Sequence, residues 1–422
     1  MQADRFAALR SRDFRLLLAS QWTSQLGAQM QRIAIAWHVY VLSHDAVALG
    51  LLGLFRVLPV FLFSLLGGVA ADAQDRRRIL AWTQAGMLLT AVLLAILTLS
   101  GIVNIWLIYA LVFLRGVAST FEGPSHQSLV PSLVTHQHVA NAFSLDAISG
   151  EVALILGASA GGVLIGGLGG VGAVYALSAV AALVAMFLVQ LIRTTVRERY
   201  ELSPFSLSAV LDGFRYLRTS PVIMGAMLMD FFATFFGSAN VLLPFFASDI
   251  LHVGAEGYGL LAAAPSVGSI LAGVAMSART QFRRPGALVL WAVLVYGVAT
   301  TLFGLSTFFL LSLFLFALTG AGDTVSMILR QTIRQLATPD ALRGRLTSIN
   351  MIFSSGGPQL GELEAGIIAN LWGAPVAVVT GGLGCILAVA LVAKLAPALR
   401  NYDGSHLRPP EPTENAMVLS RQ

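Results

Sequence analysis

The stretch GVAADAQDRRR, residues 68–78, separates two long apolar runs and ends in three consecutive arginines. The flanking runs, at 46–71 and 79–99, are each long enough to cross a bilayer, which takes roughly 20 helical residues. A short basic loop between two such runs is typical of the cytoplasmic face of a membrane protein. This stretch therefore predicts two membrane helices joined on the cytoplasmic side.

Apolar runs of this kind recur along the whole chain, and arginines gather in alternate gaps between them. The other gaps, around residues 44, 102, 169, 252, 306 and 373, contain neither Lys nor Arg. This alternation places both termini in the cytoplasm. The expected spans cover residues 14–41, 46–71, 79–99, 104–121, 142–166, 172–192, 222–247, 257–278, 286–306, 308–330, 346–370 and 375–397.

The composition agrees with a membrane protein, since 56% of the residues are apolar and 11% are charged. Soluble domains carry about 25% charged residues. The basic residues lie in short loops beside apolar runs, which favours contact with membrane lipid over nucleic acid. A single cysteine excludes an intrachain disulfide and a multi-cysteine metal site. We expect no metal and no cofactor, and we expect a monomer.

The start of the chain lacks the short apolar core of a secretory signal, so we expect the first span to be retained. The two halves also show a weak repeat. At a shift of 204 residues Gly116 matches Gly320 and Gln127 matches Gln331, as Gly162 matches Gly366. The predicted fold is an all-α membrane protein with twelve transmembrane helices in two six-helix pseudo-repeat bundles. Its segments are a cytoplasmic N-terminus 1–13, bundles 14–193 and 222–400, a cytoplasmic connection 194–221 and a disordered cytoplasmic tail 401–422.

Residues 68–78 resemble motif A of the major facilitator superfamily, with a glycine, an aspartate four positions later and a basic run. Ala73 replaces the usual basic residue, and Asp75 replaces the usual glycine. The segments 124–127, 141–142, 213–218 and 339–345 resemble the branch that includes enterobactin exporters. The resemblance implies a cytoplasmic gate, for which the candidate residues are Gly68, Asp72, Asp75, Arg76 and Arg77. The alternative is a loop that serves only membrane topology.

A glycine cluster in the fifth span, at Gly157, Gly161 and Gly162, resembles the antiporter motif C of the same superfamily. Ala158 stands where that motif has proline, which weakens the inference of proton antiport. The alternative reading is close helix packing through small residues.

Charged residues inside apolar runs are the candidates for function, because a charge at mid-bilayer costs at least about 2.5 kcal/mol. By resemblance, spans 1, 4, 7 and 10 line a central cavity. The predicted substrate and proton residues there are Gln25, Gln29, Arg32, Arg115, Glu122, Asp230 and Asp323.

Ion pairs are expected to satisfy some of these charges. Arg56 is expected to pair across the bundles with Glu362 or Glu364, because spans 2 and 11 are neighbours in the family fold. Arg32 with Glu151 is a second candidate pair. Two helical turns separate Asp323 from Arg330 by about 10.5 Å along the axis, so we expect no direct salt bridge between these two.

The sequence is identified as a major facilitator permease of the bacterial inner membrane that moves a small molecule by alternating access. The chain contains no nucleotide-binding loop, so protons are the expected coupling ion. Efflux of an amphiphilic compound of the drug or siderophore type is the first expectation. Uptake, lysophospholipid-type transport and a membrane sensor or scaffold without transport remain alternatives. No catalytic constellation can be assembled, so we do not expect an enzyme.

Overall fold

The computed structural model describes residues 6–73, 76–167, 169–193, 217, 220–278, 282, 284–338 and 343–403, and within them the chain forms helices and no strands. The first long helices are α1 (Arg12–Ser43), α2 (Ala46–Ala73), α3 (Arg76–Leu99), α4 (Ile105–Leu129), α5 (Val139–Gly167) and α6 (Gly170–Gln190). The later ones are α8 (Pro221–Phe236), α10 (Gly254–Ser277), α11 (Pro285–Leu305), α12 (Phe309–Ala337), α13 (Arg343–Trp372) and α14 (Ala374–Leu395). Short helices are η1 (Ala7–Arg10), η2 (Val130–Leu133), η3 (His136–His138), η4 (Ala239–Leu242), α9 (Leu243–Phe245), η5 (Phe246–Ile250) and α15 (Pro397–Arg400).

Local chemistry fixes several helix ends. The Ser11 hydroxyl accepts a hydrogen bond from the Phe14 amide at 3.3 Å, and the Asn104 side chain accepts one from the Leu107 amide at 2.9 Å. Both are N-caps, which satisfy amides that have no partner within the helix. At the other end of α1, His44 takes the left-handed conformation with φ 48°, which stops the helix. Gly373, with φ 90°, makes the sharp turn between α13 and α14.

Ten helices in the described part of the chain are long and apolar enough to cross a membrane. Two further long helices, α1 and α13, are not among them. Their sequences are more polar, with four glutamines and three arginines in α1 and with Gln359, Glu362 and Glu364 in α13. Polar helices of this length survive in a membrane when their polar faces turn toward the protein interior.

The helices differ from the predicted spans in three places. Residues 222–247, predicted as one helix, are broken after Phe236 by a turn, η4, α9 and the π-helix η5. Pro244 lies in the first turn of α9, where the missing proline amide needs no partner, so it suits the start of a new helix. Helices α4 and α12 extend by about two turns beyond 121 and 330. Most of the predicted connection 194–221 and tail 401–422 lies outside the described residues.

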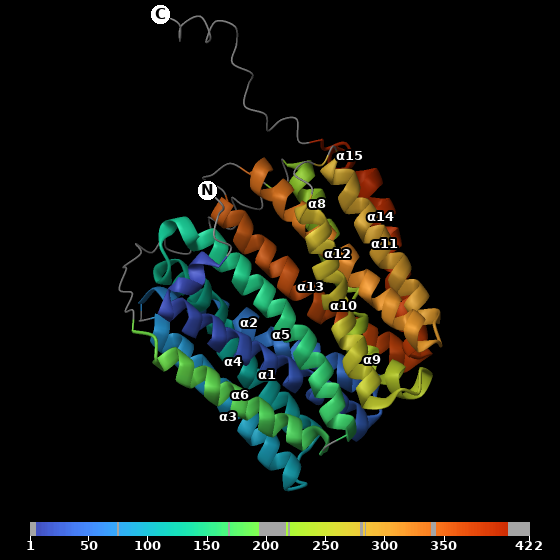
Figure 1. Cartoon of the computed structure of the whole chain (residues 1–422). Helices are drawn as coiled ribbons and strands as arrows, with labels where there is room; N and C mark the ends of the chain where they lie inside the picture. The colour runs from blue at the N-terminus through green and yellow to red at the C-terminus, as the bar shows by residue number, and fades with distance from the viewer. Residues whose placement is uncertain are drawn as a thin grey trace, which may run out of the picture.

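The helices pack in two sets that follow the order of the chain (Figure 1). In the N-terminal set, α1 packs on α5 and α6, α3 packs on α4 and α6, and α2 packs on α4. In the C-terminal set, α12 packs on α10 and α11, and α14 packs on α8, α11 and α13. The sets meet through two helix pairs, α2 with α13 and α5 with α10.

Backbone crosses backbone at both of these meeting points. A Cβ atom added to Gly162 of α5 would lie 2.6 Å from the Cα atom of Gly259 in α10. A Cβ atom added to Gly366 of α13 would lie 2.9 Å from the Cα atom of Gly50 in α2. Only glycine allows helices to approach this closely. We call these two places the glycine crossings.

Arginines gather at one end of the molecule, which we call the arginine end. There the Arg76 guanidinium at the start of α3 donates to the Ser128 carbonyl at 3.1 Å, and Ala8 donates to the Asn141 side chain at 3.1 Å. The starts of α11 and α13 and the end of α12 bring further arginines to the same end. Both glycine crossings lie in the opposite half of the molecule, where α2 and α10 begin and where α5 and α13 end.

Aromatic residues add contacts between the sets at this opposite end. The Tyr40 hydroxyl at the end of α1 donates to Asp249 of η5 at 2.5 Å. The Trp37 ring stacks on Tyr258 of α10, with 5.7 Å between the centroids. The two sets are therefore closed against each other at the end remote from the arginines.

Candidate functional site

An ion pair joins the two sets at the centre of the molecule. Arg56 of α2 places Nη1 3.1 Å from Oε2 and 3.2 Å from Oε1 of Glu362 in α13. The two side chains are 26% and 15% exposed, so the pair is largely shielded from solvent. Of the two glutamates considered from the sequence, the structure brings Glu362 to Arg56. Glu364 lies on another face of α13, within electrostatic range of Cys385 in α14.

Two more arginines gather around this pair. Arg115 of α4 donates a hydrogen bond to the Gln31 side-chain oxygen, and Gln31 is 2% exposed. Arg32 of α1 interacts electrostatically with Arg56, Glu362 and Arg115. We call Arg32, Arg56 and Arg115 the arginine cluster. Three guanidinium groups in one neighbourhood repel one another; Glu362 contacts one of them, Arg56, and Glu122 interacts electrostatically with Arg115.

Arg32 itself has no hydrogen bond or ion pair within the described residues. Its side chain is exposed although the residues on either side, Gln31 and Ile33, are buried. The expected pair with Glu151 does not form; Glu151 instead forms a hydrogen bond with Ser266 of α10. In a membrane protein, an arginine that is exposed between buried neighbours is stabilised by water or an anion beside it.

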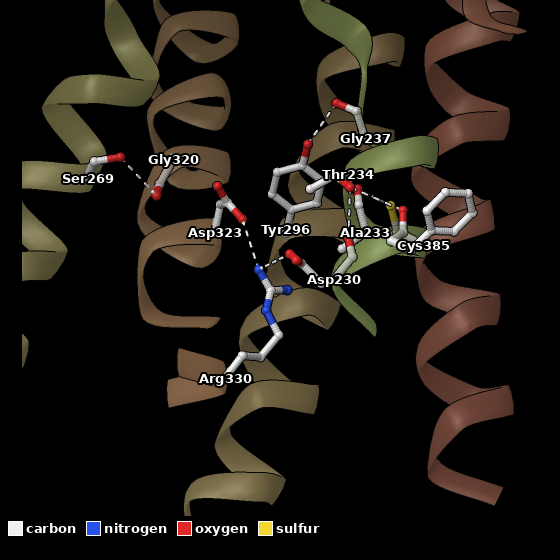
Figure 2. A network of polar contacts seen from close by, with 11 residues as sticks. Asp230, Ala233, Thr234, Gly237, Ser269, Tyr296, Gly320, Asp323, Arg330 and Cys385 are labelled. Carbon is white, nitrogen blue, oxygen red and sulfur yellow. Dashed lines mark hydrogen bonds and ion pairs between the residues drawn. The ribbon is translucent and has the colours of Figure 1, made fainter. Parts of the chain in front are cut away.

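A second polar network lies in the C-terminal set (Figure 2). Arg330 of α12 places Nη2 2.8 Å from Oδ1 of Asp230 in α8 and 3.7 Å from Oδ1 of Asp323. The expectation that Asp323 and Arg330 are too far apart for a salt bridge was wrong. Helical side chains lean toward the N-terminus, and the long arginine side chain reaches back along the two turns that separate the Cα atoms.

The two acids differ in exposure. The Asp323 side chain is 48% exposed, whereas those of Asp230 and Arg330 are 14% and 7% exposed. The Nη1 atom of Arg330 is buried without a hydrogen-bond partner. Asp230 is therefore the main partner of the arginine, and Asp323 is the acid that solvent or a ligand can reach.

Asp323 borders a cavity of about 170 Å³ between α5 and the C-terminal set. Its polar lining includes Glu151, Asn240, Ser266, Ser269, Tyr296 and Asp323. The Tyr296 hydroxyl donates to the Gly237 carbonyl at 2.7 Å, as Figure 2 shows. A Cβ atom on Gly237 would lie 2.0 Å from that hydroxyl, so a glycine is needed there.

Three residues predicted to line the cavity have other surroundings. Glu122 accepts hydrogen bonds from Gln84 at 3.1 Å and Ser24 at 3.5 Å, among α1, α3 and α4. Gln29 is 9% exposed and packs on Gly157 of α5, and Gln25 packs on Gly150 of the same helix. The polar stripe of α1 thus divides into glutamines that contact α5 and an arginine that stays accessible.

The motif A segment lies partly outside the described structure. Gly68 and Asp72 belong to α2, but the Asp72 side chain, like the whole of Asp75, lies outside the described residues. The Arg76 side chain is 6% exposed, and Arg77 donates to the Gln190 carbonyl. Together with the contact of Arg76 to Ser128, these bonds hold the start of α3 against the ends of α4 and α6.

The glycines of α5 make close backbone contacts. A Cβ on Gly157 would lie 2.8 Å from the Leu26 carbonyl oxygen, and a Cβ on Gly161 would lie 3.4 Å from Ile33, both in α1. Gly162 forms one of the glycine crossings. This glycine cluster therefore packs α5 between α1 and α10.

Sequence reasoning missed Gln31 and Tyr296, which hold Arg115 and Gly237. The signal available for Gln31 was weak, because it lies off the glutamine stripe of α1. Tyr296 is in α11, an apolar helix in which a tyrosine is a common core residue.

A helical assembly of this kind, with charged groups between two helix sets, is the architecture of a membrane transporter. The profile of the transmembrane secretion effector family, which belongs to the major facilitator superfamily, matches residues 3–420, and the chain belongs to this family.

Curated relatives and solved structures agree with this assignment. The enterobactin exporter EntS of Citrobacter koseri is 23% identical over 408 residues, which cover 96% of both chains. The enterobactin exporter EntS of Escherichia coli strain K12 is 23% identical over 391 residues, covering 92% of this chain and 93% of its own. A bacterial homologue of the human lysosomal transporter Spinster, in an inward-facing and unoccupied conformation, has a similar fold. Its TM-score is 0.72 at 14% identity, with 95% of this chain and 99% of that chain covered. The nucleoside transporter NupG gives a TM-score of 0.70 at 13% identity, covering 92% and 98%.

Proposed function

We propose that this chain is a secondary active exporter of the bacterial inner membrane. It has twelve transmembrane helices in two six-helix repeats, and it moves a small amphiphilic compound by alternating access. Family membership, the all-helical fold and the exporter relatives support the proposal. The arginine end faces the cytoplasm, together with both termini, because arginines accumulate on that side of bacterial membrane proteins.

The observation that carries the substrate assignment is the exposed Arg32 of the arginine cluster, which has no hydrogen bond or ion pair within the described residues. A guanidinium inside a membrane protein is stabilised by a carboxylate, a phosphate or another anion. Glu362 already pairs with Arg56, and Gln31 is a neutral partner for Arg115. The substrate therefore carries an acidic group that binds Arg32, as well as apolar surface.

The places where the two sets touch support alternating access. The glycine crossings and the Tyr40–Asp249 bond close the end opposite the arginines. This matches a state that receives substrate from the cytoplasm. The Arg56–Glu362 pair is a gate contact that breaks when the sets separate at this end. The motif A segment, from Gly68 to Arg77, is the matching latch at the arginine end.

Asp323 is the best supported proton carrier. It borders the cavity and is half exposed. It lies 3.7 Å from Arg330, whereas Asp230 lies 2.8 Å from the same guanidinium. Protonation of Asp323 removes its ion pair with Arg330. The buried Arg330 guanidinium keeps its ion pair with Asp230. Asp230 and Glu122 are less suited, because each is held by closer partners within its own set.

Binding and counterflow measurements on the purified full-length protein test this function. Thermal stability is first measured with a panel of amphiphiles matched in size, comprising catecholate siderophores, other acidic compounds, neutral compounds and cationic compounds. Ligand binding raises the unfolding temperature. We expect acidic members to stabilise the wild type and to exchange in counterflow in proteoliposomes.

The variant Arg32→Gln should lose at least tenfold in affinity for the acidic compound, since a hydrogen bond to a charged group contributes about 1.5–3 kcal/mol. Arg15→Gln is the matched control, because Arg15 is exposed on the same helix but at the arginine end. The substrate assignment would be wrong if only neutral or cationic compounds stabilised the protein and if they stabilised Arg32→Gln as much as the wild type. Binding without counterflow would favour a sensor over a transporter.

A further inference from the structure

A groove of about 680 Å³ lies on the surface between α11 and α14, beside the short helix α15. It is at the arginine end of the C-terminal set, where α11 begins and α14 ends (Figure 1). The floor and walls are apolar and comprise Leu290, Trp291, Leu294, Val389 and Ala393. Arg284, Arg400, Asn401 and Asp403 form the rim.

The groove opens onto a surface that faces acyl chains. Next to it along α11, Val295 and Val298 are 39% and 41% exposed, and Leu302 is 48% exposed. On α14, Leu387 and Leu391 are 70% and 46% exposed. An apolar surface of this extent is normal only against lipid, so the groove continues a lipid-covered face of the protein.

The rim provides positive charge at the level of the lipid headgroups. Arg284 precedes the first turn of α11, and Arg400 ends α15; both side chains are exposed. Two guanidinium groups face one carboxylate, that of Asp403, so the rim carries a net positive charge. Trp291, 64% exposed, lies about two turns inward, as expected of a tryptophan at the membrane interface.

We propose that this groove is a binding site for an anionic phospholipid, with phosphatidylglycerol as the lipid chemistry that fits it best. Arg284 and Arg400 bind the phosphate. Asn401 and Asp403 hydrogen-bond the glycerol hydroxyl groups of the headgroup. One acyl chain lies along Leu290, Leu294 and Val389, beneath the Trp291 ring. Basic pockets between membrane helices on the cytoplasmic side are known to bind anionic lipid headgroups.

The bound lipid would stabilise the place where α8, α11 and α15 meet. The residues that follow α14 pack on α8, because a Cβ on Gly225 would lie 3.0 Å from Ala396 and 3.3 Å from Leu399. They also pack on α11, where the Gly286 amide donates to the Tyr402 carbonyl at 3.5 Å. A lipid held by Arg284 and Arg400 connects the start of α11 to this segment. Binding therefore raises the thermal stability of the C-terminal set, whatever the transported substrate is.

Native mass spectrometry of the detergent-purified full chain tests the proposal. Phosphatidylglycerol and phosphatidylcholine with identical acyl chains are titrated separately. The wild type should retain phosphatidylglycerol preferentially. Each basic residue near an anionic headgroup contributes about fivefold in affinity, so Arg284→Gln with Arg400→Gln should weaken binding by about 30-fold. Arg15→Gln, which removes an exposed arginine from the same end without touching the groove, should bind like the wild type.

A second variant separates the groove from general charge effects. Ala393→Trp fills the apolar floor without altering any charge and should reduce phosphatidylglycerol binding while the rim stays intact. If the double arginine variant fails to fold, Ala393→Trp still tests whether the lipid binds in the groove. Equal binding of the two lipids, or unchanged binding in the groove variants, would overturn the proposal. So would equally tight binding of glycerol 3-phosphate, which has the anion but no acyl chains.

Discussion

Removal of Glu362 should open the end of the molecule that is closed in this structure. Glu362→Gln leaves Arg56 without its ion pair and leaves the arginine cluster without a contacting carboxylate. Exposed ion pairs contribute about 0–1 kcal/mol, and loss of one partner from a buried pair costs about 3–5 kcal/mol. The side chains here are 26% and 15% exposed, which places the loss at about 2 kcal/mol. The closed state should therefore lose about 30-fold in population relative to the open one.

Glu362→Gln should lower the closed population more than Arg56→Gln does. Arg56→Gln also breaks the pair, but it removes one of three mutually repelling guanidinium groups and so should shift the equilibrium less. The charge swap Arg56→Glu with Glu362→Arg should restore part of the closed population. Arg12→Gln is the control, because Arg12 forms an ion pair with Asp13 at 3.7 Å within α1 and joins no two helix sets.

Spin-label distances measure this equilibrium directly. Cys385 is the only cysteine and is buried, so a Cys385→Ala background accepts labels at Val41→Cys and His252→Cys. Both positions are exposed at the closed end, one in each set. The wild-type pair should give a short distance, and Glu362→Gln should add a longer one. The same short distance in Glu362→Gln, or a charge swap no better than the single variants, would refute the gate.

Three further outcomes are expected. Asp323→Asn should abolish the pH dependence of transport in proteoliposomes, whereas a pH profile equal to that of the wild type would show that Asp323 carries no coupling proton. Gly162→Val should disrupt its glycine crossing and lower the unfolding temperature or the closed population. Gly167→Val, with no atom within 4 Å of an added Cβ, should change neither. Cys385 should not react with a maleimide in the folded protein and should react after denaturation, so rapid labelling under native conditions would contradict its burial.

The positions of the helices were predictable because apolar runs and arginine-rich loops are local properties of the chain. The starts of α1 and α2 agree with prediction to within two residues. The break after Phe236 was not predicted, because the apolar pattern continues through it. Proline and glycine signals there were present but were outweighed by hydrophobicity.

The side-chain partners were harder to predict because they depend on how each helix is rotated against its neighbours. Asp230 and Asp323 share Arg330 from different helices, and no sequence spacing shows this. Glu122 was assigned to the cavity from its face on α4, yet Gln84 of another helix holds it. Arg56 and Glu362 were considered together only because the family resemblance makes their helices neighbours.

The glycine crossings have a mechanical consequence. While both crossings stay in contact, the two helix sets retain one easy rotation, about the line that joins the crossings, and this rotation opens or closes the arginine end. Both places here consist of main chain, without side chains that interlock. The axis of such a hinge is set by main-chain atoms, including the Glu362 carbonyl, and not by the side chains of Arg32 and Asp323. Under the proposed transport function, substitutions of Arg32 or Asp323 should thus alter which compound is moved while the direction of this rotation stays the same.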